Sequence, residues 1–420
     1  MGRSVVGIGI LGAFLAGWAS YRVLDEAPAA TMPPQLATRV GGLAHSDEAV
    51  AFSLGRMHSY LSLGVPSELV RERILSDRLA RSIGRDGRAL VAEILDYGRE
   101  IVSEKPRRQT RKRFFRRLDA LNQKLADAGL GYYLYASFEW DDETDRVDEI
   151  NFDTLDIKAV RTYRVGERTI RMLHVERDGV PNSHAMALGF TAPDYRDEAF
   201  LDLGDVEYEV EYGLLPARVP FGESELFSVT DDYAKAAWYQ RFRARVAEVM
   251  SEDIGVDRAS PERARAALVA AVEIHELQHQ IDYQYKPPVR GVFRAVADRL
   301  QNRPLAAKCM YETSAHLAQL ARDPVSARVM LGEIVSYGFT NSCDDPDCLA
   351  ALVIVDELAF ELGGQGKPGQ LVVSESYHPR ALADRYTTLL EHSPAALAEA
   401  AERAWTRVFQ RPLETIERVH

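Results

Sequence analysis

The sequence lacks the motifs that mark nucleotide-binding sites and serine nucleophiles. It contains no P-loop, no glycine-rich dinucleotide fingerprint, no G-x-S-x-G pattern and no internal repeat. Each of these motifs builds a phosphate cradle or an exposed nucleophile, so its absence argues against that class of site. Positive charge is also scarce, with 51 Lys and Arg against 63 Asp and Glu. The resulting net charge of -12 argues against general nucleic-acid binding, and we expect no nucleic-acid partner.

Cysteine is the next scarce residue, with three in 420 residues. No C-x2-C pair or Cys/His cluster is present, which argues against a cysteine-based zinc site. In an oxidising compartment Cys343 and Cys348 could close a small loop, or Cys309 could pair with either of them. One cysteine must remain unpaired in each case.

Long apolar runs are limited to the N-terminal segment, where residues 5–19 follow Arg3 without a charge. A membrane-spanning helix needs about 20 apolar residues, so this run is short for a span and suits the core of a signal peptide. An uncleaved membrane anchor over residues 5–24 is the alternative. We therefore expect an extracytoplasmic protein of the periplasm or cell envelope, either secreted or anchored by this segment.

The remaining sequence, with 46% apolar residues, is that of a globular protein with a sizeable core. Residues 1–30 are the signal peptide or anchor, and residues 31–130 are predicted to be helical, with a break at 84–87. Residues 131–230 form a β-rich region, because a period of two from Tyr132 to about Val219 predicts strands with turns at 165–167 and 178–179. Residues 231–420 are predicted to be helical. The predicted fold class is α+β, with an antiparallel-rich sheet.

The helical region contains His275-Glu276-Leu277-Gln278-His279, an H-E-x-x-H motif. The helix is predicted to start at Pro261, after Ser260, and to stop before Pro287-Pro288. Residues four apart share a helix face, so both imidazoles can bind one metal ion while Glu276 lies beside its water. Zinc lowers the pKa of that water to about 7, and the carboxylate of Glu276 can accept its proton as general base.

A third ligand is expected from a second helix, predicted over 304–322. It carries Glu312 and His316, one turn apart. Here the chain resembles the gluzincin metallopeptidases over residues 261–324. That resemblance implies Glu312 as third zinc ligand, a zincin-like catalytic unit with a sheet before the H-E-x-x-H helix, and a helical C-terminal lobe. Two features depart from the thermolysin-like pattern. The 32 residues between His279 and Glu312 form a longer gap than in the thermolysin-like and aminopeptidase branches, although other gluzincins have longer gaps still. His316 occupies the position of an aspartate that supports a zinc-bound histidine in thermolysin-like enzymes.

Several residues remain alternatives for the supporting roles. His316, or Asp282 or another acid, could replace Glu312 as the third ligand. Asp282 lies three residues after His279 and could accept the free N–H of its imidazole, as metal-bound histidines require. Tyr377 and His378 are candidates for holding an oxyanion, and an ordinary loop pair is the competing interpretation. Two imidazoles and one carboxylate would also accept manganese or cobalt.

The sequence therefore predicts an exported zinc metallopeptidase that hydrolyses peptide or protein amide bonds. The competing hypothesis is a non-catalytic envelope protein, a binding or scaffold module with an inert or structural metal site. A second alternative is a self-processing protease whose helices before Gly129 act as a prosegment. No sequence feature identifies the substrate or the oligomeric state.

Overall fold

The computed structural model describes most of the chain from Asp77 onward. The described residues are 77–104, 110–128, 131–141, 146–177, 188–191, 195, 197–214, 233, 235–255, 261–339, 343–364, 367–373 and 379–419. The predicted signal peptide or anchor, Ser260, Tyr377 and His378 lie outside these ranges. No helix within the ranges combines the length and apolar character that a membrane-spanning helix requires.

The fold is mixed α+β and divides into two compact units. Unit 1 contains the described residues up to Asp205 together with the strand that begins at Ile416, and unit 2 contains Val206–Thr415. The α+β class agrees with the prediction from sequence. The division differs from a simple succession of regions, because the chain leaves unit 1, builds unit 2 and then returns to unit 1.

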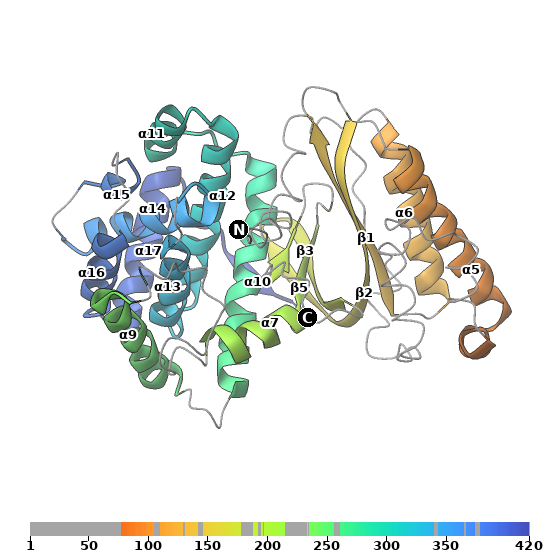
Figure 1. Cartoon of the computed structure of the whole chain (residues 1–420), viewed down its shortest axis with the longest axis horizontal. Coiled ribbons are helices and arrows are strands. Elements are labelled where there is room, and N and C mark those ends of the chain that lie inside the picture. The colour runs from red at the N-terminus through yellow and green to blue at the C-terminus, as the bar shows by residue number, and fades with distance from the viewer. Residues whose placement is uncertain are drawn as a thin grey trace, which may run out of the picture. The chain divides into compact units, whose positions relative to one another are not determined.

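Unit 1 is a sheet covered by two helices (Figure 1). Its elements are α5 (Asp77–Glu104), α6 (Arg111–Asp127), β1 (Tyr132–Asp141), β2 (Arg146–Val165), β3 (Arg168–Arg177), β4 (Gly189–Phe190), β5 (Glu198–Asp202) and β6 (Ile416–Arg418). The strand order is β1-β2-β3-β5-β4, and β6 pairs with β2. All pairs are antiparallel except β3 with β5. The predicted antiparallel-rich sheet is therefore present.

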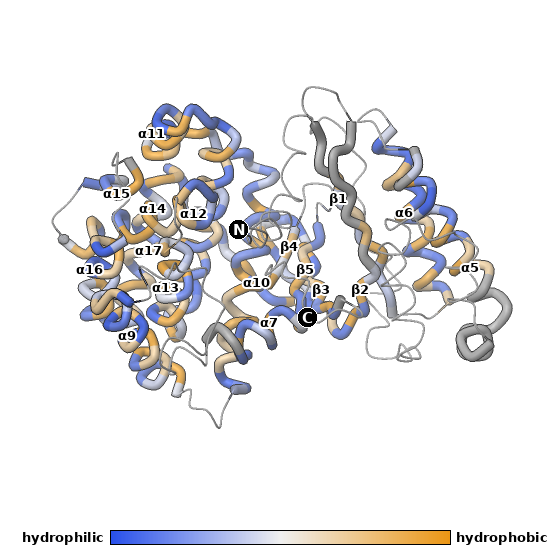
Figure 2. The backbone as a smooth tube through the Cα atoms, in the orientation of Figure 1, coloured by the Kyte–Doolittle hydropathy of each residue, from blue (hydrophilic) through white to orange (hydrophobic). Residues whose placement is uncertain are grey.

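The core of unit 1 lies between the sheet and α6. One side of α6 is apolar and the other polar, as Figure 2 shows by colour, and the apolar side buries Phe114, Phe115 and Leu118. Phe115 meets Phe138 of β1 edge to face, with ring centroids 5.6 Å apart. Such contacts add to the area that the rings bury, so the aromatic side chains contribute strongly to the core of unit 1.

Two predictions for unit 1 were wrong at the level of elements. α5 runs through 84–87 without a break. A helical glycine costs only about 1 kcal/mol relative to Ala, and burial of residues such as Leu90 and Ile94 on the same helix outweighs that cost. β5 ends at Asp202, and helical turns follow to Leu214 where strands were predicted, because the Asp202 carboxylate accepts the N–H of Gly204 at 2.9 Å and starts a helix. Val219 and the predicted turn at 178–179 lie outside the described residues. The turn at 165–167 is confirmed, with Gly166 at φ 59°.

Unit 2 is helical (Figure 1). Its elements are α7 (Leu203–Tyr208, shared with unit 1), the π-helical turn η3 (Glu209–Leu214), α9 (Ala237–Ile254), α10 (Pro261–Tyr285), α11 (Gly291–Leu300), α12 (Arg303–Arg322), α13 (Ala327–Ser336), the 3₁₀ turn η5 (Tyr337–Phe339), α14 (Pro346–Glu361), α15 (Gln370–Val373), α16 (Pro379–Leu389) and α17 (Pro394–Phe409). α12 packs against α10, α14 and α17 and is the central helix. The predicted helical C-terminal lobe is confirmed, except that β6 follows α17.

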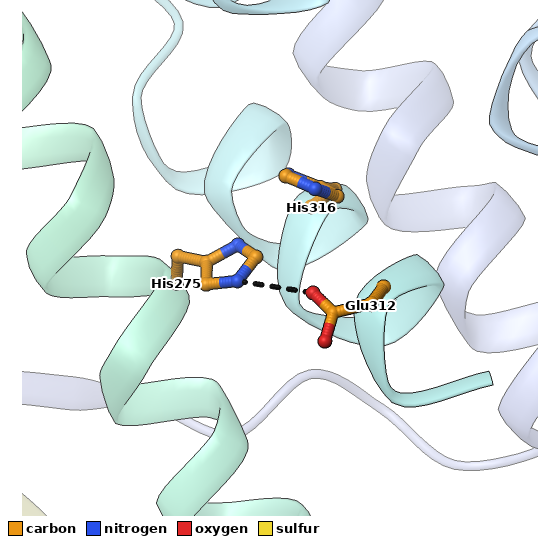
Figure 3. Close-up of side chains that lie close together, drawn as sticks. All are labelled: His275, Glu312 and His316. Carbon is orange, nitrogen blue, oxygen red and sulfur yellow. Dashed lines mark ion pairs between the residues drawn. The ribbon is translucent and has the colours of Figure 1, made fainter. Parts of the chain in front are cut away.

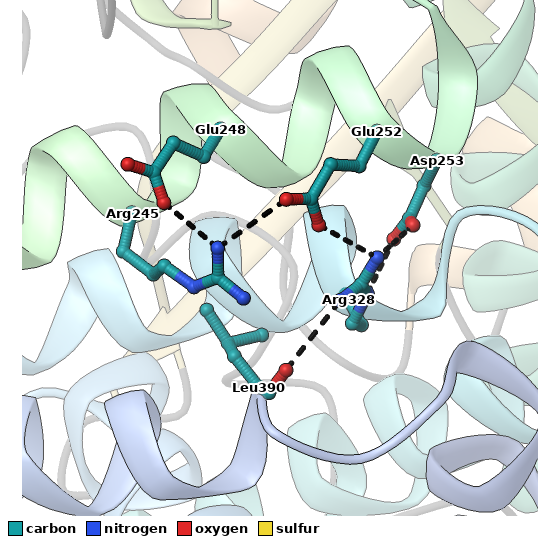
Figure 4. A network of polar contacts seen from close by, with 6 residues as sticks. All are labelled: Arg245, Glu248, Glu252, Asp253, Arg328 and Leu390. Atoms are coloured by element: carbon teal, nitrogen blue, oxygen red, sulfur yellow. Dashed lines mark hydrogen bonds and ion pairs between the residues drawn. The ribbon is translucent and has the colours of Figure 1, made fainter.

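A charged network fastens α9 to α13 (Figure 4). Arg328 of α13 donates to Asp253 at 2.7 Å and to Glu252 at 3.1 Å, and Arg245 donates to Glu248 at 2.7 Å. The side chain of Asp253 is 5% exposed, so the Arg328–Asp253 pair is largely shielded from water, whereas Glu248 is 60% exposed. The first pair therefore bears on stability far more than the second.

The cysteines also belong to unit 2. Cys343 and Cys348 form a disulfide across the start of α14, with Cα atoms 5.3 Å apart, and Cys309 is a buried free thiol on α12. This is the first of the pairings that the sequence allowed.

The acids of α14 bind arginines: Asp356 pairs with Arg385, and Glu357 pairs with Arg407.

Candidate metal centre

The two helices that carry the predicted ligands have clear local signals at their ends. α10 starts at Pro261 and ends at Tyr285, where Lys286 turns to a positive φ of 45° ahead of the two prolines. α12 starts after Asn302, whose side chain accepts the N–H of Leu305 at 3.0 Å, and ends before Asp323. Both helices match their predicted limits. Their packing against each other brings the H-E-x-x-H motif to Glu312.

Three of the predicted ligand atoms lie together. Nε2 of His275 is 3.0 Å from Nε2 of His279, and Oε2 of Glu312 is 3.4 Å from the first nitrogen and 3.5 Å from the second. Figure 3 shows His275 of α10 and Glu312 of α12 turned toward each other. All three side chains are largely buried, with at most 14% of their surface exposed.

This spacing fits a single small cation. Zinc holds imidazole nitrogens and carboxylate oxygens at about 2.0–2.2 Å, so tetrahedral ligand atoms lie about 3.3–3.6 Å apart. The separations of 3.4 and 3.5 Å fall in that range and the separation of 3.0 Å is slightly shorter, and a point about 2 Å from all three atoms exists. His275, His279 and Glu312 could therefore hold a metal ion together.

His316 lies beside this group and is a further ligand candidate. Ligand atoms of His275, Glu312 and His316 lie within 4.8 Å of one another, so this triad could also hold a metal ion. Figure 3 shows His316 one turn along α12 from Glu312. The ring of His316 is hydrogen-bonded through Nδ1 to Gln319 at 3.3 Å. His279 and His316 are therefore two alternative imidazoles that could share an ion with His275 and Glu312.

Burial and mutual charge set the protonation of these groups. Burial lowers the pKa of His275, and burial together with the nearby His275 lowers the pKa of His316 to about 3. Burial raises the pKa of Glu312, but His279 and His275 outweigh it and hold that pKa well below its usual value. Burial also opposes charge on His279, yet Glu312 raises its pKa to about 9. Three of the four groups are therefore already in the form that binds a metal.

Glu276 is placed to exchange protons beside the ligands. It is 5% exposed, and burial, with the charge of Glu312, raises its pKa to about 8 against the opposing effect of His279. A carboxyl group that titrates near neutral pH can both accept and return a proton during a reaction. Such a group could serve as a general acid or a general base beside the ligands.

Asp282 lies one turn beyond His279 and is fully buried. Its Oδ1 accepts hydrogen bonds from Gln278 at 3.1 Å and from Arg411 at 2.8 Å. Nδ1 of His279 is buried without a hydrogen-bond partner among the described residues. The predicted bond between Asp282 and His279 is thus absent from the described contacts, although both atoms that it needs are available.

No protein family model, no curated protein and no solved structure matches this chain. The geometry and chemistry of these residues therefore carry the functional argument.

Several acidic residues near the site were not predicted from the sequence. Burial, reinforced by the charge of Glu312, raises the pKa of Asp347 at the start of α14. Burial also raises the pKa of Tyr337 well above its usual value, and the charges of Glu333, Asp347 and Glu209 add to this effect. The ring of Tyr337 is 6.3 Å from that of His316. These residues come from α14, α13, η3 and η5, four elements that a local motif cannot connect. Asp347 follows Pro346 and resembles an ordinary acid of a first helical turn, so no local signal marks it.

Proposed function

We propose that this chain is a zinc-dependent hydrolase of peptide or other amide bonds with a zincin-like catalytic unit. The observation that supports it best is the convergence of His275 Nε2, His279 Nε2 and Glu312 Oε2 at separations of 3.0, 3.4 and 3.5 Å. Two helices supply these atoms, and the motif between the histidines supplies the acid that the reaction needs. A chance H-E-x-x-H sequence would not require a carboxylate from a second helix at this spacing.

In this proposal His275, His279 and Glu312 hold the ion, and three protein ligands leave one position open. Zinc in such a site would polarise a carbonyl group and lower the pKa of a bound water molecule to about 7. Glu276 accepts the proton of the attacking water and returns it to the departing amine. Burial of the site strengthens the charge interactions on which these transfers depend.

The proposed setting is extracytoplasmic, with a peptide or protein as substrate. The disulfide between Cys343 and Cys348 supports an oxidising compartment, where such bonds persist. The uncharged run over residues 5–19 supports export.

The test compares metal content and hydrolysis in the parent chain, Glu276→Gln and Glu262→Gln. Glu262 is exposed in the first turn of the same helix and is the matched control. We expect about one zinc per chain by elemental mass spectrometry in all three. Hydrolysis of a peptide library should fall by at least about 100-fold in Glu276→Gln and remain unchanged in the control.

Two results would contradict the proposal. A well-folded parent that binds no zinc even when zinc is supplied would leave the non-catalytic envelope scaffold as the better account. A parent that binds zinc, unfolds when His275 is replaced and is insensitive to Glu276→Gln would identify a structural metal site.

A further inference from the structure

The side of α10 next to the ligand histidines carries a buried polar network. Gln278 is 1% exposed and occupies a variable position of the H-E-x-x-H motif. Its Nε2 donates to Asp282 at 3.1 Å and to Ser314 of α12 at 3.5 Å, and its Oε1 accepts from Arg322 at 3.1 Å. Gln278 precedes His279, and Ser314 lies two residues after Glu312. The network therefore ties α10 to α12 one residue from His279 and two residues from Glu312.

Arg411, in the segment after α17, completes this network. It donates to Oδ1 of Asp282 at 2.8 Å, and its guanidinium lies over the rings of Tyr285, at 4.2 Å, and Trp405, at 5.0 Å. Trp405 in turn donates from its indole nitrogen to Ser314 at 3.0 Å. Two aromatic faces thus hold the cation that is bonded to the buried carboxylate.

The Ser314 hydroxyl also stabilises the charge of Asp282, and Oδ2 of this carboxylate lies outside the bonds to Gln278 and Arg411. Oδ2 of Asp282 and Nδ1 of His279 are both buried, and neither has a hydrogen-bond partner among the described residues. The two residues are three apart on α10 and so share a face. A metal-bound imidazole usually donates its other N–H to a carboxylate or carbonyl, which orients the ring. Asp282 offers the acceptor and His279 offers the donor.

We propose that Arg411 is a positioning residue of the metal centre. It anchors Asp282 through Oδ1, which leaves Oδ2 to accept the N–H of His279 and to orient that imidazole for the metal. Arg411 touches neither metal nor substrate, and its effect passes through Asp282. This inference rests on the proposed zinc site and adds to it a residue more than 130 positions from the motif.

A double-mutant cycle on zinc affinity tests this role in the full chain. Arg411→Met removes the charge and keeps most of the stem, and Asp282→Asn removes the anionic acceptor. Zinc dissociation constants are measured by competition with a chromophoric chelator at fixed pH. We expect each single variant to bind zinc about 10- to 100-fold more weakly, as loss of such supporting residues does. The double variant should be no weaker than Asp282→Asn alone, because Arg411 acts through that carboxylate.

Two further variants separate positioning from simple structural support. Arg411→Lys keeps the charge and should recover part of the zinc affinity. Arg403→Met is the matched control, because Arg403 lies on α17, close to Arg411 in the sequence, but is 50% exposed and pairs with Glu361 instead of Asp282. It should bind zinc as the parent does. If Arg411→Met alone fails to fold, the double variant removes the unpaired buried carboxylate, and Arg411→Lys supplies the comparison.

Three outcomes would overturn the inference. A folded Arg411→Met with the zinc affinity of the parent would show that Arg411 does not position the site. Losses that add fully in the double variant would show that it acts independently of Asp282. A parent that binds no zinc would instead remove the proposed function, and this inference with it, so the two failures are distinguishable.

Discussion

The interiors of the two units are built from different chemistry. In unit 1, rings fill the space between helix and sheet: Tyr135 stacks on Tyr195 at 4.9 Å and Phe190 on Phe200 at 5.0 Å. In unit 2, two histidines and a glutamate meet inside a helical core, with Asp282 and Gln278 buried behind them. Burial stabilises the first interior and opposes the charges of the second.

This difference indicates what each interior is for. A protein gains nothing in stability from buried ionisable groups that apolar side chains of the same volume could replace. Unit 1 also buries ionisable side chains, but Glu198 accepts a hydrogen bond from Tyr133 and Asp202 accepts one from Gly204. We therefore propose a chemical role only for the cluster in unit 2. Substitutions in unit 1 should change stability and leave metal binding alone, whereas substitutions at the centre of unit 2 should do the reverse.

The largest expected effect is on the aromatic core. Phe115→Ala removes a ring that is 0% exposed and packed against Phe138 and Tyr195, and it should lower the free energy of unfolding by about 3–5 kcal/mol. Urea denaturation followed by circular dichroism measures this. The same substitution at Phe360, which is 44% exposed, should cost about 1 kcal/mol or less. Zinc affinity of Phe115→Ala at low urea should equal that of the parent, and a large loss would show that the two interiors are not independent.

The charged network of Figure 4 gives the next effect. Arg328→Met leaves Asp253 buried without its arginine and should destabilise the protein by about 2–4 kcal/mol. Arg245→Met removes pairs with Glu248 and Glu252, which are 60% and 49% exposed, and should cost less than about 1 kcal/mol. Equal losses in urea denaturation would refute the view that burial decides the value of these pairs.

Two substitutions on α12 test which of Glu312 and His316 is the third ligand. Glu312→Gln should weaken zinc binding by about 100-fold or more, because it removes the negative charge of the one carboxylate among the three proposed ligands. His316→Asn should weaken it by less than about tenfold, because His316 is proposed to stand beside the ion. Competition titrations measure both. The reverse order would make His316 the ligand and Glu312 its neighbour.

The smallest effect concerns pH. His279 has a pKa of about 9 in the protein without metal, since Glu312 outweighs burial, and zinc must displace that proton. Zinc affinity should therefore rise with pH, by about tenfold per unit, and level off only near pH 9. An ordinary histidine would level off near its usual pKa of about 6.5. Titrations at pH 7, 7.5, 8 and 8.5 distinguish the two, and a constant affinity over this range would contradict the raised pKa.

Local signals carried much of the sequence prediction. Pro261 and the prolines after Lys286 bound α10, and Asn302, Pro304 and Asp323 bound α12, so both helices could be predicted almost to the residue. The helical period then placed His275 and His279 on one face, and one turn joins Glu312 to His316. These predictions depend on neighbours in the sequence, where caps and periodicity act.

Tertiary contacts account for what the sequence did not show. Asp347, Glu333 and Glu209 lie near Tyr337 on separate elements, and Arg411, just after the end of α17, pairs with Asp282 on α10. The three-residue strand β6 is too short to show a period of two, and its partner β2 lies far away in the sequence. The early end of the sheet depended on one side-chain contact of Asp202, which periodicity does not report.

The pairing of β6 with β2 constrains how the chain folds. Tyr163 lies opposite Arg418, so all of unit 2 is a loop between two strands of one sheet. Closing so long a loop in an unfolded chain carries a large entropic cost, which falls once the intervening residues have condensed. We therefore expect β6 to join late during folding and to open first by local unfolding. Amide hydrogens of 416–419 should then exchange with solvent sooner than those of β1, even though both belong to the same sheet.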